Sequence, residues 1–181
     1  MRDLRLARSR PHLTVSSLLQ PLPPATRYIL RGAASARAAA EGALGVGLPT
    51  QACRAARDGE RAALWLGPDE WLLIAPDSQA AAMGAALDAA LTGLPHSLVD
   101  VSHRQTACSV CGPQAAALLG AGCPLDLDPS AFPVDMCTRT MLAKTEVVVW
   151  RTAAEAFRIE VWRSFAAYVS QFLAEAARWI K

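Results

Sequence analysis

The sequence lacks a long apolar run, although 52% of its 181 residues are hydrophobic. No stretch reaches the roughly 18–20 consecutive apolar residues of a membrane span. Pro11 and the proline-rich residues 20–24 also interrupt the region that follows the N-terminal arginines. We therefore expect neither a membrane helix nor a secretory signal. The five cysteines are an odd number, which argues against a complete set of intrachain disulfides, so a reducing cytoplasm is the expected compartment.

Lysine is scarce, because only Lys144 and Lys181 are lysines among the 18 basic residues. The formal net charge of +2 is unevenly placed: residues 1–10 carry four arginines and one aspartate, and the rest of the chain is almost neutral. A nucleic-acid-binding face needs clustered Lys and Arg on the folded body. The body has no such cluster in its sequence, so nucleic acid is not the expected partner.

Motifs for autonomous cofactor binding and for serine hydrolysis are absent. The chain contains neither G-x-x-x-x-G-K-[ST] nor G-x-G-x-x-G, and Gly45-Val46-Gly47 follows an expected helix instead of opening one. It also contains no G-x-S-x-G nucleophile elbow. Residues 100–104 (DVSHR) combine the groups of a catalytic triad, but neighbouring side chains in a strand scatter. We predict a strand end whose polar groups satisfy neighbouring backbone, and no catalytic or cofactor-binding residue.

Cys108 and Cys111 form a C-x-x-C pair, and Cys123 and Cys137 follow singly. A structural zinc site usually needs a second tight ligand pair. If residues 106–111 form a strand, thiols three positions apart point to opposite faces and cannot chelate one ion. We therefore expect no metal ligand and interpret the cysteines as buried or partly buried small hydrophobes. A zinc- or thiol-binding protein using Cys108 and Cys111 remains the alternative.

Strand and helix signals alternate along the chain. Short apolar or alternating segments bounded by turn residues predict strands over residues 28–30, 53–57, 62–66, 71–75, 98–101, 106–110, 138–142, 146–151 and 157–162. Helices are predicted over residues 33–44, 79–91, 113–120 and 164–180. Asp77 or Ser78 would cap the second helix, and Pro113 would occupy the first position of the third. The last helix is predicted to be one-faced and amphipathic, with an apolar stripe of Phe165, Tyr168, Val169, Phe172, Ala176 and Trp179.

The fold class indicated is α+β, with antiparallel sheets, helices packed on one face and two intertwined small lobes. Residues 1–25 are predicted to form a basic, proline-rich N-terminal arm whose proline cluster is a semi-rigid spacer. The arm is expected either to lie on a partner or to be a frayed terminus. Residues 26–181 form the α+β domain, with sub-lobes at roughly 26–103 and 104–181. Most of the five tryptophans are expected in the core, and Trp179 is expected to face outward or toward a partner.

Several segments, in order and at suitable spacing, carry a family resemblance. They are residues 66–73 (LGPDEWLL), 99–106 (VDVSHRQT), 123–127 (CPLDL), 132–133 (FP) and 157–165 (FRIEVWRSF). Together they resemble the gamma subunit of heterotetrameric sarcosine oxidase over about residues 26–178. The arm lies outside this resemblance, and the C-x-x-C pair is not part of it.

The resemblance implies a fold related to folate-binding aminomethyltransferase and to the first domain of a tRNA-modifying GTPase. It also implies a cytoplasmic bacterial complex that demethylates sarcosine oxidatively to glycine, passes the one-carbon unit to tetrahydrofolate and forms hydrogen peroxide. In that family FAD, FMN and NAD lie on the alpha and beta subunits, zinc on delta and folate on alpha. The implied role is a non-catalytic structural subunit without cofactors of its own, whose partners are alpha, as the main contact, beta and delta.

A free-standing folate-binding protein of the aminomethyltransferase superfamily is a second alternative. Its iron–sulfur maintenance branch is marked by a K-x-C-Y-x-G-Q-E segment. Nothing in this chain matches that segment, because Cys137 is followed by Thr138-Arg139.

Overall fold

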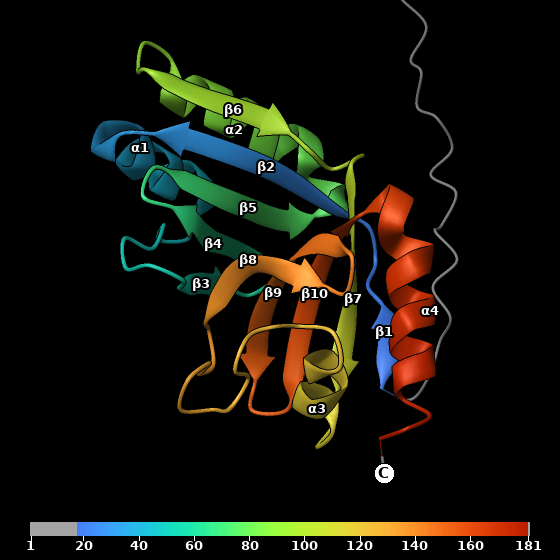
Figure 1. Ribbon diagram of the computed structural model, residues 1–181. Coiled ribbons are helices and arrows are strands. Elements are labelled where there is room, and N and C mark those ends of the chain that lie inside the picture. The colour runs from blue at the N-terminus through green and yellow to red at the C-terminus, as the bar shows by residue number, and fades with distance from the viewer. Residues whose placement is uncertain (1–17, 181) are drawn as a thin grey trace, which may run out of the picture.

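Ten strands form two five-stranded antiparallel sheets within residues 18–180, the part of the chain that the computed structural model describes (Figure 1). The first sheet has the order β3-β4-β5-β2-β6 and the second the order β1-β7-β10-β9-β8. The strands of the first sheet are β2 (Ala25–Gly32), β3 (Ala55–Asp58), β4 (Arg61–Gly67), β5 (Glu70–Pro76) and β6 (His96–Asp100). Those of the second are β1 (Leu19–Pro21), β7 (Gln105–Cys111), β8 (Cys137–Leu142), β9 (Thr145–Ala153) and β10 (Ala156–Trp162).

Each sheet carries helices on one face. Two helices, α1 (Ala34–Leu44) and α2 (Ala80–Leu91), share a hydrophobic core with the first sheet. Two others, α3 (Ala115–Gly120) and α4 (Ala166–Ala176), share one with the second sheet. Short 3₁₀ turns, η1 (Asp77–Gln79) and η2 (Arg163–Phe165), lead into α2 and α4. The buried face of α1 consists of Ala36, Ala40 and Leu44, and its small alanines allow close packing on the strands, whereas α2 buries the larger side chains of Met83, Leu87 and Leu91.

The inner faces of the two sheets pack against each other. Successive strand residues point to opposite faces, so Ala63 and Leu73 join the core beneath α1 and α2. Their neighbours Leu64 and Leu72 join a third core, which also contains Trp150 of β9. The layers therefore run helix, sheet, sheet, helix, which confirms the α+β prediction with antiparallel sheets.

The described end of the predicted arm is part of the second sheet. Leu19–Pro21 forms β1, and these residues pair with Cys108–Val110 of β7. Pro21 is tolerated because β1 is an edge strand. The spacer prediction is therefore wrong for β1, while residues 1–17 lie outside the described residues. The chain crosses from the second sheet to the first after β1 and returns to the second sheet after β6. We propose a sub-lobe boundary near residue 103 because it lies at this second crossing.

The predicted strands and helices are present, but two helix starts differ. The residue preceding α2 is Gln79, which makes no capping bond with its side chain, so the prediction of Asp77 or Ser78 as the cap is wrong. The chain first makes the 3₁₀ turn η1 and begins α2 only at Ala80. Likewise α3 begins at Ala115, two residues after Pro113. Among residues 18–180 no helix is long and apolar enough to cross a membrane.

The C-terminal helix buries a different face from its predicted stripe. It ends at Ala176, and its buried residues are Ala166, Val169, Ser170 and Leu173. Of the six stripe residues only Val169 is buried; Phe165, Tyr168 and Trp179 are exposed, and the other two are half-buried. Trp162 is exposed as well, whereas Trp65 and Trp71 lie opposite each other on adjacent strands, as predicted.

Candidate functional site

A buried ionic cluster joins the two sheets. Arg27 lies in the middle of β2, and its Nε donates to Glu160 Oε2 of β10 at 2.6 Å. Arg158, two residues before Glu160 on the same strand, donates through Nε to Glu160 Oε1 at 2.8 Å. The side chains of Arg27 and Glu160 are only 2% and 1% exposed. The second guanidinium nitrogen of Arg27, Nη1, donates to Ala25 O at 2.9 Å, which holds the arginine in place.

The two arginines decide the charge state of Glu160. Burial alone would raise its pKa, because a charged carboxylate loses its hydration. The charges of Arg158 and Arg27, and the hydrogen bonds that both donate, outweigh this effect and hold the pKa of Glu160 below its ordinary value. Glu160 is therefore ionised at neutral pH and does not serve as a proton donor.

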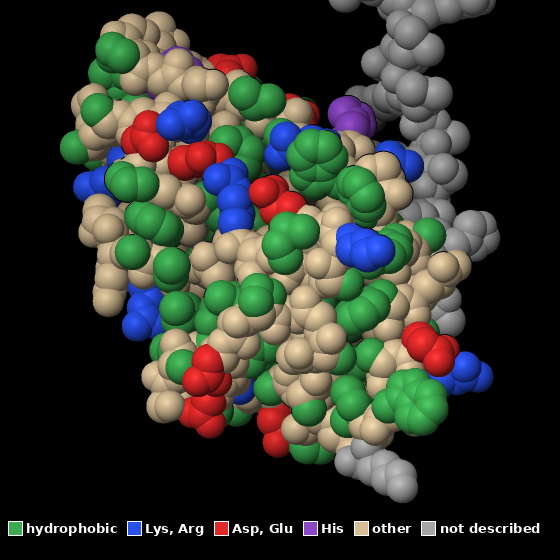
Figure 2. All heavy atoms as spheres, in the orientation of Figure 1, with side chains coloured by type: hydrophobic (Ala, Val, Ile, Leu, Met, Phe, Trp, Pro, Cys, Tyr) green, Lys and Arg blue, Asp and Glu red, His purple; other side chains and the backbone are tan. Residues whose placement is uncertain are grey.

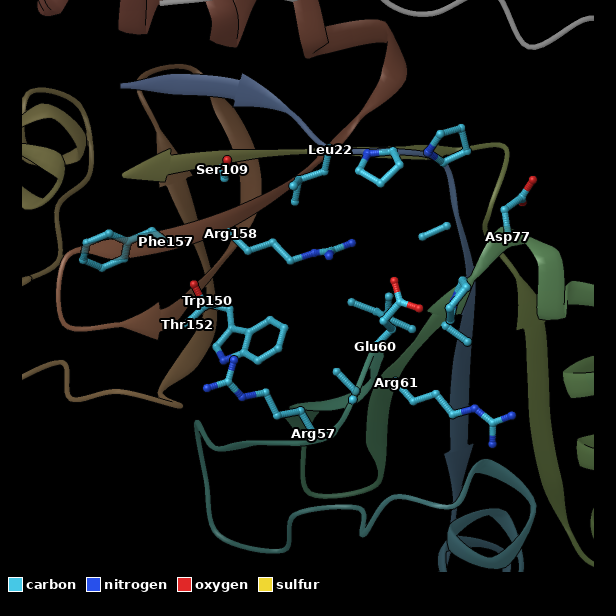
Figure 3. A pocket seen from close by; sticks show the side chains of 18 residues that line it. Leu22, Arg57, Glu60, Arg61, Asp77, Ser109, Trp150, Thr152, Phe157 and Arg158 are labelled. Atoms are coloured by element: carbon cyan, nitrogen blue, oxygen red, sulfur yellow. The ribbon is translucent and has the colours of Figure 1, made fainter. Parts of the chain in front are cut away.

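A cavity of about 480 Å³ opens beside this cluster, between the two sheets (Figure 3). Pro23 and Pro24, on the connection from β1 to β2, line one part of it, and Trp150 and Phe157 of the second sheet line another. Figure 3 shows Arg158 reaching into the cavity above Trp150. The Nε1 of Trp150 is buried and has no hydrogen-bond partner, so the cavity wall retains an unused donor.

The three arginines in the cavity wall have partners. Arg61 Nη1 donates to Leu44 O at 2.7 Å, and Arg57 Nε lies 3.8 Å from Asp135 Oδ1. Arg158 is held by Glu160, as described above. The cavity therefore combines apolar walls with arginines that are held by other groups of the protein, an arrangement that suits a joint between sheets better than a reaction centre.

Residues 100–104 are used structurally. Ser102 Oγ accepts the backbone N–H of Arg27 at 2.8 Å, and Asp100 Oδ1 accepts the backbone N–H of Ser102 at 2.8 Å. His103 is exposed, and the guanidinium of Arg104 lies 5.1 Å from the centre of the Trp162 ring. The prediction that polar groups here satisfy neighbouring backbone is confirmed for Ser102 and Asp100, and the structure does not bring these residues together as a triad.

The C-x-x-C cysteines lie on opposite faces of β7, as the strand period predicts. Cys108 is buried, and burial raises the pKa of its thiol to about 12, whereas Cys111 is exposed. Burial likewise raises the pKa of Cys137 to about 12, and its Sγ lies 3.6 Å from Trp65 O. Such raised values keep both thiols protonated and poorly nucleophilic. Within residues 18–180 no three His, Cys, Asp or Glu side chains gather as metal ligands.

The ionic cluster and the cavity were not predicted from the sequence. The available signal was the placement of charges inside apolar strands, in residues 26–30 (TRYIL) and 157–162 (FRIEVW). A charge that is central in a buried strand needs a partner. The sequence does not show which partner, because Arg27 and Glu160 are 133 positions apart.

The sequence matches the model of the "Sarcosine oxidase, gamma subunit family" over residues 31–178. A sarcosine oxidase subunit gamma from Arthrobacter sp is 41% identical over 123 residues, which cover 67% of this chain. The matched region spans only 60% of the length of that relative.

Two solved structures have a similar fold. One is heterotetrameric sarcosine oxidase from Corynebacterium sp. U-96 in complex with pyrrole 2-carboxylate, with a TM-score of 0.83 and 35% identity; the match covers 88% of this chain and 83% of that one. The other is the glycine cleavage system aminomethyltransferase T from Bartonella henselae, with a TM-score of 0.65 and 16% identity, covering 88% of this chain and 46% of that one. The second likeness concerns the fold alone.

Proposed function

This chain belongs to the sarcosine oxidase gamma subunit family, and on that basis we propose that it is a non-catalytic structural subunit of a heterotetrameric sarcosine oxidase. The observation that carries the proposal is the family match over residues 31–178, together with the likeness to a chain of a heterotetrameric sarcosine oxidase at a TM-score of 0.83. Its expected setting is the cytoplasm.

The roles of the polar residues support a structural role. Glu160 is occupied by two arginines, Ser102 and Asp100 accept backbone N–H groups, and Cys108 is a buried thiol of raised pKa. A general base, nucleophile or oxyanion donor must have a free position facing a substrate. These groups instead hold the two sheets and the connection after β6 in place.

The reaction belongs to the complex in this proposal. The assembled enzyme demethylates sarcosine to glycine, passes the one-carbon unit to tetrahydrofolate and reduces oxygen to hydrogen peroxide. FAD, FMN and NAD are carried by the alpha and beta subunits, folate by alpha and zinc by delta. This chain contacts chiefly alpha and brings no cofactor, metal ligand or catalytic residue.

The proposal is tested with the chain purified alone and with the purified complex. The isolated chain is expected to be colourless, without flavin absorbance, and to oxidise no sarcosine. The complex that contains it is expected to show flavin absorbance and to oxidise sarcosine. Flavin that remains bound to the isolated chain at a stoichiometric level would contradict the proposal.

The same preparation separates the two alternatives. Tetrahydrofolate that binds the isolated chain below millimolar concentration would favour a free-standing folate-binding protein. Stoichiometric zinc in elemental analysis, lost when Cys111 is replaced by serine, would favour the metal or thiol protein. We expect neither result.

A further inference from the structure

Helix α4 has two apolar faces, and only one of them is buried among the described residues 18–180. Its buried residues are Ala166, Val169, Ser170 and Leu173, which pack on the second sheet. A second stripe begins with Phe165 and Tyr168, which are exposed, whereas Phe172, one turn further on, is half-buried and packs against the core of the second sheet. At 3.6 residues per turn the centres of the two stripes lie about 120° apart around the helix axis. Phe165 and Tyr168 therefore point away from the sheet on which α4 packs.

The exposed aromatic side chains continue from α4 onto the end of β10. Trp162 is 41% exposed, Phe165 42% and Tyr168 36%, and the three follow one another at intervals of three residues. Figure 2 shows hydrophobic side chains along α4 on the visible face. Clustered exposed aromatics are typical of interfaces, where Trp and Tyr supply most of the binding energy. We call Trp162, Phe165 and Tyr168 the aromatic face.

The charges near the aromatic face are mainly basic. The Arg104 guanidinium lies 5.1 Å from the Trp162 ring, and the backbone N–H of Arg163 donates to Arg104 O at 2.8 Å. Lys144 is in the turn beside α4, since the Cβ position of Gly122 would lie 3.1 Å from Ala143 N and 2.5 Å from Phe172 Cζ. The acidic residue Glu146 of β9 lies across from Trp162, because Val147 pairs with Val161 of β10. The rim of the face thus has an excess of positive charge.

We propose that the aromatic face is the surface by which this chain docks on a different subunit of the oxidase, whose matching surface is apolar with an acidic rim. This inference rests on the proposed function, because it requires a partner subunit. Complementary charge at the rim speeds association and excludes wrong partners. It fixes the register of a contact that the aromatic side chains stabilise.

Charge argues against two other occupants. A second copy of the chain in a two-fold contact would bring two basic rims together. The chain's own N-terminal segment carries four arginines and one aspartate in residues 1–10, so its charge has the same sign as the rim. A partner subunit with an acidic rim meets neither repulsion.

The test is co-expression of all four subunits with this chain carrying Trp162→Ser, Phe165→Ser and Tyr168→Ser together. We expect the triple variant to bind the other subunits at least about 100-fold more weakly, and Trp162→Ala alone at least about tenfold. The matched control is Val134→Ser, because Val134 is 42% exposed and the next residue, Asp135, bonds through its backbone to Ala55 of β3 and Arg151 of β9. It should assemble normally. All variants should keep the thermal unfolding midpoint of the wild type within a few degrees, since the changed side chains are exposed.

The outcomes distinguish this inference from the proposed function. If the wild-type chain does not join the complex, the proposed function fails. If wild type and triple variant assemble equally well, the function stands and the docking face is wrong. A dimer of the isolated wild-type chain that the triple variant abolishes would identify a second copy as the occupant. Acrylamide quenching of tryptophan that rises on deletion of residues 1–17 would identify the N-terminal segment, and either result overturns the proposal.

Discussion

Glu160 carries a buried negative charge between Arg27 of the first sheet and Arg158 of its own strand. Such a pair stabilises the fold less than its Coulomb energy suggests, because both ions lose their hydration. Removing one member is nevertheless costly, since the other charge stays buried without compensation. Glu160 therefore reports on how tightly the two sheets are joined.

We predict that Glu160→Gln lowers the free energy of unfolding by about 3–5 kcal/mol, because Arg27 keeps its charge in a buried position. The measurement is urea unfolding followed by far-UV circular dichroism. Asp69→Asn is the control, since the pair of Arg31 and Asp69 is 56% and 55% exposed and should change stability by no more than about 0.5 kcal/mol. Equal effects of the two substitutions would show that the cluster is not buried in solution.

The lowered pKa of Glu160 also predicts a pH dependence. The folded-state value lies below 4.5, the ordinary value, so the unfolded chain takes up this proton more readily. The stabilisation is fully present above pH 4.5 and is lost as pH falls through the lower folded-state pKa. Unfolding between pH 7 and pH 3 should therefore show a smaller loss of stability in Glu160→Gln than in the wild type. Parallel curves for the two proteins would contradict this assignment.

At the scale of elements, α4 is held by close contact with the loop after α3. A Cβ at Gly122 would lie 2.5 Å from Phe172 Cζ and 3.1 Å from the backbone N of Ala143, so the site has room only for hydrogen. Gly120, at the end of α3, has no heavy atom within 4 Å of the same position. The two glycines form a matched pair for testing this contact.

We predict that Gly122→Ala destabilises the chain by about 1–3 kcal/mol through overpacking, whereas Gly120→Ala is neutral or stabilising by up to about 1 kcal/mol. Thermal unfolding of the two variants measures the difference. A wild-type midpoint for Gly122→Ala would mean that α4 shifts at no cost, and the aromatic face would then not be held in a fixed position.

Strand positions and strand faces follow largely from the sequence, while the order of the strands in the sheets and the orientation of α4 do not. The alternation of side-chain direction along a strand correctly places Cys108 and Cys111 on opposite faces of β7. The predicted stripe over residues 165–179 does not match the buried face of α4, because only Val169 belongs to both. Hydrophobic periodicity reports that a face avoids water but not what covers it, so a face suited to a partner resembles one suited to the core.

At the scale of the whole molecule, the fold was predictable because resemblance and strand patterning agree. The cavity and the ionic cluster were not predictable, because they depend on the packing of the two sheets. That packing brings Arg27 of β2 and Glu160 of β10 together, although β1, which precedes β2 in the chain, belongs to the other sheet. The polar residues that suggested chemistry, Ser102 and Asp100, instead close the connection between the sheets. These assignments are consistent with a chain whose contribution is assembly.

The mass and composition of the purified oxidase, determined by native mass spectrometry, test the central claim most directly. We predict a complex in which this chain accompanies alpha, beta and delta, and which releases flavin and zinc only from those three subunits. An oxidase that is fully assembled and active without this chain would contradict the account.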